Sequence, residues 1–366
     1  MTDTAPLFRP LSLDSITLAN RIVMAPLTRG RSGVDRIPNE LMREHYVQRA
    51  GAGLIITEAT SISEQGLGWD QSPGIYNQAQ VEGWRKVVEG VHAAGGKIFL
   101  QLWHVGRASH PDFQPDGQLP VSSSAVQPAG EIHTPLGKKP YVTPRALELS
   151  EIPGLIQTYV AATERAKAAG FDGVEVHTAN GYLLDQFLRD GVNQRQDAYG
   201  GSLENRSRLV LEVVDAVVKA WCANRVGVRF SPLNTFNDIT DSNPIATFTY
   251  AAEKLNDFGL AYLHVMEPIV REHMMYAEGE PVAPQIRKVF TGPLMLNGGY
   301  DAITGAKAIA SGAADFISYG IPFIANPDLP ERYRQDLPLN QPNFDTFYTH
   351  EAEGYTDYPF AAPVST

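Results

Sequence analysis

Short apolar runs alternate with stretches of helical periodicity along most of the chain. RIVMAPL at 21–27 and GLIIT at 53–57 are the first two runs, and a helical stretch follows each of them. The predicted strands are 21–27, 53–57, 97–102, 171–176, 225–230, 262–265, 294–297 and 316–319, and the predicted helices are 38–50, 78–94, 151–169, 203–221, 245–258, 283–289, 302–311 and 327–335. Because the strands are almost continuously apolar, they predict a parallel sheet whose outer face is covered by helices.

Eight such units favour a closed (β/α)₈ TIM barrel over an open doubly wound sheet. The open sheet would be favoured by a GxGxxG sequence after the first strand, and the chain has none there. We expect one α/β barrel domain over 1–366, with three additions. Residues 7–18 should form an N-terminal hairpin over the barrel bottom, 105–144 a long insertion or lid after strand three, and 337–366 a C-terminal tail that wraps the surface.

Composition narrows the possible partners. The chain has 366 residues, of which 43% are hydrophobic and 19% are charged, and its net charge is −11. This charge argues against nucleic acid or an anionic membrane as the main partner. The single cysteine, Cys222, leaves no disulfide or zinc–cysteine cluster and fits a reducing compartment. The N-terminus lacks the pattern of a signal peptide and no apolar run approaches the ~20 residues of a membrane span, so we expect a cytoplasmic protein.

The predicted strand ends carry amide, hydroxyl and guanidinium groups. In a barrel of this type, chemistry gathers at the C-terminal ends of the strands. Thr28, Gln101 and Arg229 lie there, together with glycine-rich loops after strands seven and eight. The strand ends offer no set of metal ligands, no Schiff-base lysine and no Ser–His–Asp set. Any one of these residues could simply cap the barrel, but the whole set suits a flat heterocycle with carbonyls, such as a flavin, with its phosphate in the glycine loops.

Three further polar side chains follow the fourth strand. His177 and Asn180 offer neutral hydrogen-bond donors, and Tyr182 offers a proton with an unperturbed pKa of about 10. Such a set can hold a carbonyl or nitro oxygen while a weak acid protonates a neighbouring carbon. The same three residues are also compatible with a strand cap, a turn and half-buried packing.

Eight motifs give the chain a resemblance to a known family. They are RIVMAPLTRGR, GLIITEATSIS, GLGWDQSPGIY, IFLQLWHVGR, GFDGVEVHTANGYLLDQFLRDGVNQRQDAYGGSLENR, VGVRFSP, FIANPDLPERY and GYTDYP. In this order, they resemble the Old Yellow Enzyme family of FMN-dependent ene-reductases over nearly the whole chain. The closest resemblance is to the N-ethylmaleimide- and nitroester-reductase-like branch.

The resemblance implies an activity and its site. FMN would be held non-covalently, NAD(P)H would reduce it, and activated alkenes (enones, nitroalkenes and maleimides) would be reduced with ping-pong kinetics. Tyr182 would be the proton donor, and His177 and Asn180 would bind the activating oxygen. The implied FMN contacts are Pro26, Leu27, Thr28, Ala59, Gln101, Arg229, Asn297, Gly298, Gly299, Gly320 and Ile321, and the implied pocket aromatics are Trp69, Trp103 and Tyr355. An alternative is a flavin-binding redox sensor without ene-reductase turnover, and we expect a monomer or a homodimer.

One departure concerns the FMN phosphate. In the family, an arginine follows the glycine after strand eight and contacts this phosphate, whereas here Ile321 follows Gly320. Isoleucine has no hydrogen-bond donor, and Pro322 removes one more backbone N–H. We therefore expect the phosphate to be held by backbone N–H groups and bound more weakly than with arginine.

Overall fold

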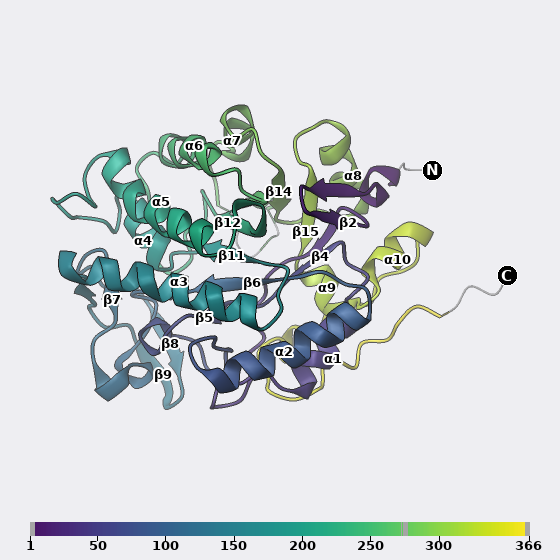
Figure 1. Cartoon of the computed structure of the whole chain (residues 1–366), viewed down its shortest axis with the longest axis horizontal. Helices are drawn as coiled ribbons and strands as arrows, with labels where there is room; N and C mark the ends of the chain where they lie inside the picture. The colour runs from purple at the N-terminus through teal and green to yellow at the C-terminus, as the bar shows by residue number, and fades with distance from the viewer. Residues whose placement is uncertain (1–3, 272, 274–276, 363–366) are drawn as a thin grey trace.

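Eight parallel strands close into a barrel. The computed structural model describes residues 4–271, 273 and 277–362. The barrel strands are β3 (Ile22–Met24), β4 (Leu54–Ile56), β6 (Ile98–Trp103), β11 (Gly173–His177), β12 (Val226–Phe230), β13 (Tyr262–Met266), β14 (Leu294–Asn297) and β15 (Phe316–Tyr319). Each pairs with the next in this order, and β15 pairs with β3 to close the ring. The predicted (β/α)₈ architecture is confirmed, with the helices wrapped around the strands (Figure 1).

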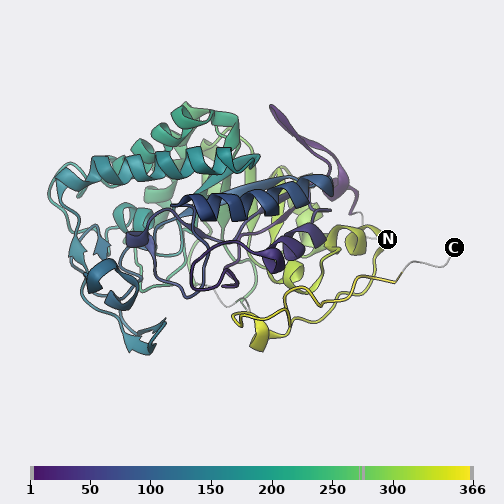
Figure 2. The ribbon, with the colours of Figure 1, turned by 60° about the horizontal axis from the view of Figure 1, so that its bottom comes forward.

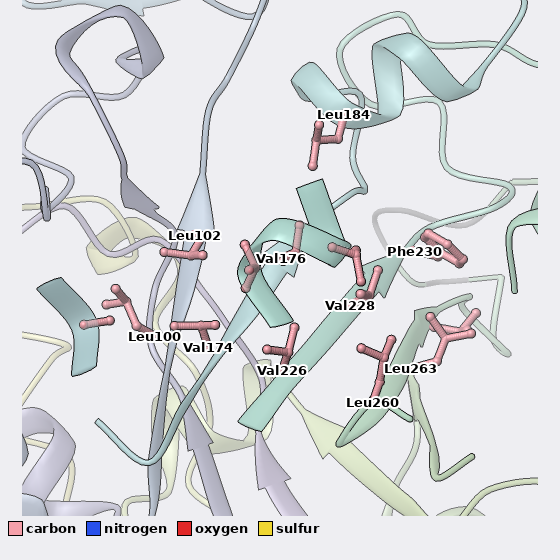
Figure 3. Close-up of a cluster of buried hydrophobic side chains, with 14 of the residues drawn as sticks. Leu100, Leu102, Val174, Val176, Leu184, Val226, Val228, Phe230, Leu260 and Leu263 are labelled. Carbon is pink, nitrogen blue, oxygen red and sulfur yellow. The ribbon is translucent and has the colours of Figure 1, made fainter. Parts of the chain in front are cut away.

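Successive side chains of each strand point alternately to the helices outside and to the barrel interior. Val174, Val176, Val226 and Val228 face outward and belong to the large core between strands and helices (Figure 3). The residues between them face the barrel interior, because successive side chains of a strand point to opposite sides. Glu175 is one of these interior residues and is fully buried. The outward-facing side chains account for the apolar pattern of the sequence. The inward-facing side chains include the polar groups at the carboxyl ends of the strands.

The eight predicted helices all form, and each begins within two residues of its predicted start. They are α1 (Glu40–Gln48), α2 (Gln78–Ala93), α3 (Ile152–Ala168), α4 (Leu183–Leu188), α5 (Leu203–Ala220), α6 (Pro244–Leu255), α7 (Ala283–Val289), α8 (Ala302–Ala310), α9 (Ile321–Ala325) and α10 (Leu329–Gln335). Side-chain caps fix several starts, since Asn39, Asn77 and Asp301 each accept a hydrogen bond from a backbone N–H of the first turn. Helix α4 was not among the predicted helices.

The N-terminal hairpin closes the barrel bottom. Strands β1 (Leu11–Leu13) and β2 (Ile16–Leu18) pair in antiparallel fashion, as predicted. Their buried side chains form one cluster with interior residues of the barrel such as Phe99 and Tyr262. The apolar positions of 7–18 are thus satisfied by the barrel interior rather than by a separate core.

The insertion after β6 has its own short strands. It contains β7 (Val121–Ser122) and the antiparallel pair β8 (Glu131–Thr134) and β9 (Gly137–Pro140), while β5 (Thr60–Ser61) and β10 (Arg145–Ala146) pair with β6 and β7. The buried Arg107 fixes the insertion by donating to the carbonyl oxygens of Val126, Asn237 and Asp238. The insertion is therefore tied to the loop that follows β12.

The C-terminal tail runs beside α1 along one edge of the molecule (Figure 2). Buried arginines fasten it: Arg29 donates to the Phe347 and Gly354 carbonyls, and Arg31 donates to the Thr346 and Phe347 carbonyls. These contacts agree with the predicted wrapping tail. Among the helices that the structure describes, none combines the length and apolar character that crossing a bilayer requires.

Candidate active site

A cavity of about 420 Å³ lies at the carboxyl ends of the barrel strands. It collects most of the residues singled out from the sequence. These are Pro26, Leu27, Thr28, Ala59, Trp69, Gln101, His177, Asn180, Tyr182, Arg229, Asn297, Gly299, Gly320 and Ile321. Ala25, Tyr319 and Pro322, which the sequence places beside the strand ends, also line it. A further group was not expected from the sequence, and it comprises Phe236, Met266, His273, Tyr300, Ser318 and Tyr348. The volume falls within the usual range of cofactor and small-molecule sites.

Three residues singled out from the sequence do not line this cavity. Trp103 is buried behind Tyr182, with the two rings edge to face and their centroids 5.0 Å apart. Tyr355 is fully buried and stacks on His45 at 3.9 Å, because the arginines that fasten the tail draw it away from the cavity. For these two aromatics, the prediction that they line the pocket is wrong. Gly298 is not part of the lining, although its neighbours Asn297 and Gly299 are.

Another aromatic of the tail takes the place expected for Tyr355. Tyr348 lines the cavity and packs against Trp69, with ring centroids 5.2 Å apart. With Phe236 it forms a partly exposed aromatic rim, since Tyr348 is 55% exposed and Phe236 is 40% exposed. The sequence indicates that an aromatic residue of the tail lines the cavity, but the tail has several aromatics and only the fold shows which one faces inward.

A tight turn after β11 brings His177, Asn180 and Tyr182 together. Asn180 and Gly181 both have positive φ, at 57° and 72°. The turn is held because the Asn180 N–H donates to Ser231 Oγ (2.7 Å) and the Gly181 N–H donates to a carboxylate oxygen of Asp185 (2.9 Å). The His177 and Tyr182 rings consequently meet edge to face, with centroids 5.1 Å apart.

Burial sets the protonation states of this group. Burial, followed by the positive charge of Arg229, lowers the pKa of His177 to about 3, so its imidazole is neutral and keeps one N–H donor. Burial raises the pKa of Tyr182 above its ordinary value, so the phenol keeps its proton at neutral pH. The cavity therefore presents a neutral donor beside an undissociated weak acid.

A buried polar network forms the floor of the cavity. Gln101 Nε2 donates to Glu175 Oε1 (2.7 Å), and His264 Nδ1 lies 2.8 Å from Glu175 Oε2. Arg229 lies opposite His264 in the sheet register, and its Nη1 is 2.7 Å from His264 Nε2. Its Nη2 donates to Asn297 Oδ1 (3.0 Å). These contacts fix the orientation of both the Gln101 amide and the Arg229 guanidinium.

The charges in this network are well defined. Burial opposes ionisation of Glu175, but His264, Arg229 and Gln101 around it hold its pKa below the ordinary value. Burial and the neighbouring Arg229 lower the pKa of His264 to about 4. A neutral His264 then donates from Nδ1 to Glu175 and accepts from Arg229 at Nε2. Sequence reasoning missed Glu175 and His264, although a lone polar residue in VEV and LHV was a usable signal.

The donor set fits a flavin mononucleotide. Arg229 Nε and His177 Nδ1 are buried and have no partner among the described residues. The turn after β14 leaves no room for side chains, because a Cβ on Gly298 would lie 2.7 Å from Pro268 and one on Gly299 would lie 2.7 Å from Val270. Orphaned donors beside the Gln101 amide and a glycine turn suit ring carbonyls, ring nitrogens and a phosphate.

At the far end of the cavity, Ile321 stands at the start of the short helix α9. The N–H groups of Phe323 and Ile324 both donate to the Gly320 carbonyl, at 2.9 and 3.3 Å. The backbone donors that can face a phosphate there are therefore those of Gly320 and Ile321 themselves, since Pro322 has none.

Comparison with known proteins is consistent with this geometry. The model of the NADH:flavin oxidoreductase / NADH oxidase family matches residues 6–340. The chain belongs to the Old Yellow Enzyme family. It is 46% identical to putative 12-oxophytodienoate reductase 11 of Oryza sativa subsp. japonica over 98% of this chain and 99% of that one. It is 41% identical to 12-oxophytodienoate reductase 2 of Arabidopsis thaliana, with 97% and 96% covered.

Solved structures of the Old Yellow Enzyme family superpose closely on the chain. The homologue from Zymomonas mobilis gives a TM-score of 0.94 at 48% identity, with 96% of this chain and 99% of that chain covered. Morphinone reductase in complex with tetrahydroNAD gives 0.92 at 49% identity, with 98% of each covered. The chain is thus a flavin-dependent NAD(P)H oxidoreductase whose cofactor is FMN.

Proposed function

We propose that this Old Yellow Enzyme family member reduces activated carbon–carbon double bonds with NAD(P)H as the reductant. The observation that carries the proposal is the convergence of His177, Asn180 and Tyr182 on the cavity that also contains Gln101 and Arg229. Bound FMN would supply hydride chemistry, taking reducing equivalents from NAD(P)H and delivering them to the β-carbon of the alkene.

The protein residues would divide the remaining work. His177 and Asn180 would donate hydrogen bonds to the activating carbonyl or nitro oxygen, where negative charge develops. Tyr182, whose high pKa keeps it protonated, would give its proton to the α-carbon. Gln101, Thr28 and Arg229 would hold the flavin ring, and the loops at Gly299 and Gly320 would hold the phosphate.

One cavity would serve both half-reactions. The nicotinamide must leave before the alkene enters, because both would meet His177 and Asn180 on the same face. This arrangement predicts ping-pong kinetics. The aromatic rim of Phe236 and Tyr348, together with Trp69 beside it, favours flat or cyclic alkenes, since offset stacking stabilises such molecules there.

The test is anaerobic mixing of the purified yellow protein with NADPH, followed by 2-cyclohexenone, a nitroalkene or N-ethylmaleimide. Bleaching of the flavin by NADPH and its return on addition of the alkene, with the saturated product formed, is the expected result. A flavin that NADPH reduces but that none of these alkenes reoxidises would contradict the proposal and indicate a redox sensor instead.

A further inference from the structure

The loop between β12 and α6 packs directly on the turn that carries the proton donor. Asn237 of this loop has φ 62°, a conformation that asparagine tolerates better than most residues. A Cβ placed on Gly181 would lie only 2.9 Å from the Asn237 Cβ and 2.5 Å from the Phe236 carbonyl oxygen. Asn237 is therefore a close neighbour of Tyr182, although it does not itself line the cavity.

The Asn237 amide has a defined orientation. The Tyr141 hydroxyl donates to Asn237 Oδ1 (3.3 Å), and Asn237 Nδ2 donates to the Asn180 carbonyl oxygen (2.8 Å). Burial raises the pKa of Tyr141, so this phenol stays protonated and acts as a donor. The amide oxygen thus faces Tyr141, and the NH₂ group faces the turn. The Asn237 side chain also lowers the pKa of Tyr182, whereas burial, which is the larger effect, raises it.

We propose that Asn237 is the positioning residue of Tyr182 and that Tyr141, from the insertion, fixes Asn237 in this role. The inference rests on the proposed ene-reductase function. One N–H of the Asn237 amide holds the Asn180 carbonyl, and in this proposal the second N–H meets the phenol oxygen and leaves the phenol O–H free to point into the cavity. When the Tyr182 O–H bond breaks and the C–H bond forms at the α-carbon, the same N–H stabilises the phenolate, which solvent water then reprotonates.

This assignment gives the insertion a role in the chemistry. Among the described residues, none from 105–144 lines the cavity. Two of its side chains nevertheless hold the Asn237 segment: Tyr141 bonds the amide, and Arg107 donates to the carbonyls of Asn237 (3.0 Å) and Asp238 (2.6 Å). The insertion would therefore act on the proton donor through Asn237 rather than as a lid over the substrate.

The sharpest variant is Asn237→Asp. Aspartate tolerates the same backbone conformation, has the same shape and still accepts from Tyr141, but it has no N–H for the phenol oxygen or for the Asn180 carbonyl. The rate of flavin reoxidation by 2-cyclohexenone should fall roughly ten- to a hundredfold, the usual effect of one hydrogen bond to a charged group. Flavin reduction by NADPH should stay within about twofold. Tyr141→Phe should give a smaller loss, because the amide keeps its N–H but not its fixed orientation.

Two readouts separate positioning from a structural effect. Reoxidation by a nitroalkene should suffer least, because its stabilised anion does not need the proton at once, whereas a distorted site would slow both alkenes and weaken binding of a phenolic ligand. Gln127→Ala is the matched control, since Gln127 bonds the Tyr141 carbonyl but not Asn237. Bound FMN per chain monitors folding.

The outcomes distinguish this inference from the function on which it rests. Wild-type protein that no alkene reoxidises would overturn the ene-reductase function itself. Wild-type turnover with an unchanged enone rate in Asn237→Asp, or equal losses for enone and nitroalkene, would overturn the assignment of Asn237 alone.

Discussion

Asn234 donates a hydrogen bond from its side-chain amide to the Asn180 side-chain oxygen over 2.8 Å. The orientation is fixed, because Asn234 Oδ1 accepts the Phe236 N–H, also at 2.8 Å, and only an oxygen can accept there. The Asn180 oxygen is thereby directed to Asn234, and its NH₂ group is left for the cavity. Asn180 is thus set as a donor before any ligand binds, as transition-state stabilisation requires.

Asn234→Asp should reverse this orientation. The carboxylate still accepts from Phe236 but now offers an acceptor to Asn180, whose amide would turn and present its oxygen to the cavity. Affinity for a phenolate ligand, followed through the flavin absorbance, should fall by about tenfold or more. Asn234→Asp with unchanged affinity would show that Asn180 does not donate to the bound oxygen.

The floor network predicts an effect on cofactor binding. His264→Gln should weaken FMN binding by about tenfold, because Arg229 loses the Nε2 acceptor that orients it. The measurement is the dissociation constant of FMN from the fluorescence of released flavin. His104→Asn is the control, since His104 is equally buried but lies outside the cavity. Equal losses in both variants would mean that general destabilisation, not Arg229, is responsible.

A substitution at Ile321 should strengthen FMN binding instead. Ile321→Arg should slow FMN dissociation roughly ten- to a hundredfold, because a guanidinium fork adds charge-assisted bonds to a phosphate. Ile321→Met, which adds length without charge, is the control. An arginine variant that releases FMN as fast as the wild type would show that the phosphate is held elsewhere.

Four buried histidines predict acid sensitivity. Burial lowers the pKa of His45 and brings those of His104 and His177 to about 3 and of His264 to about 4. Unfolded histidines bind protons below pH ~6.5, so the unfolded state takes up more protons and the free energy of unfolding falls as pH drops through that value. Above pH ~6.5, the neutral buried histidines no longer reduce the free energy of unfolding.

His104→Asn isolates one of these contributions. Asparagine can keep the acceptor that His104 Nδ1 offers to the Gly106 N–H. Between about pH 6 and 5, the slope of unfolding free energy against pH should decrease by roughly 1.4 kcal/mol per pH unit, which corresponds to one proton. Urea titrations across this range measure it, and an unchanged slope would show that His104 is not buried neutral.

The sequence predicted the barrel well because its strands are apolar on the outward face and the longer helices have a clear apolar periodicity, several with a side-chain cap. It predicted the residues of the turn at 177–182 because histidine, asparagine and tyrosine there are chemically specific. It could not distinguish Tyr348 from Tyr355, since which aromatic faces the cavity depends on the contacts of Arg29 and Arg31 with the tail. Nor could it find Asn237, whose role arises only where a distant loop meets Gly181.

Single-turnover kinetics of Tyr182→Phe decide whether Tyr182 donates the proton in alkene reduction. The phenylalanine variant should be reduced by NADPH at nearly the wild-type rate, because that half-reaction needs no proton from Tyr182. Its reoxidation by 2-cyclohexenone should be at least roughly a hundredfold slower, in line with the usual contribution of general acid catalysis. Equal slowing of the two half-reactions, or reoxidation at the wild-type rate, would show that Tyr182 is not the proton donor.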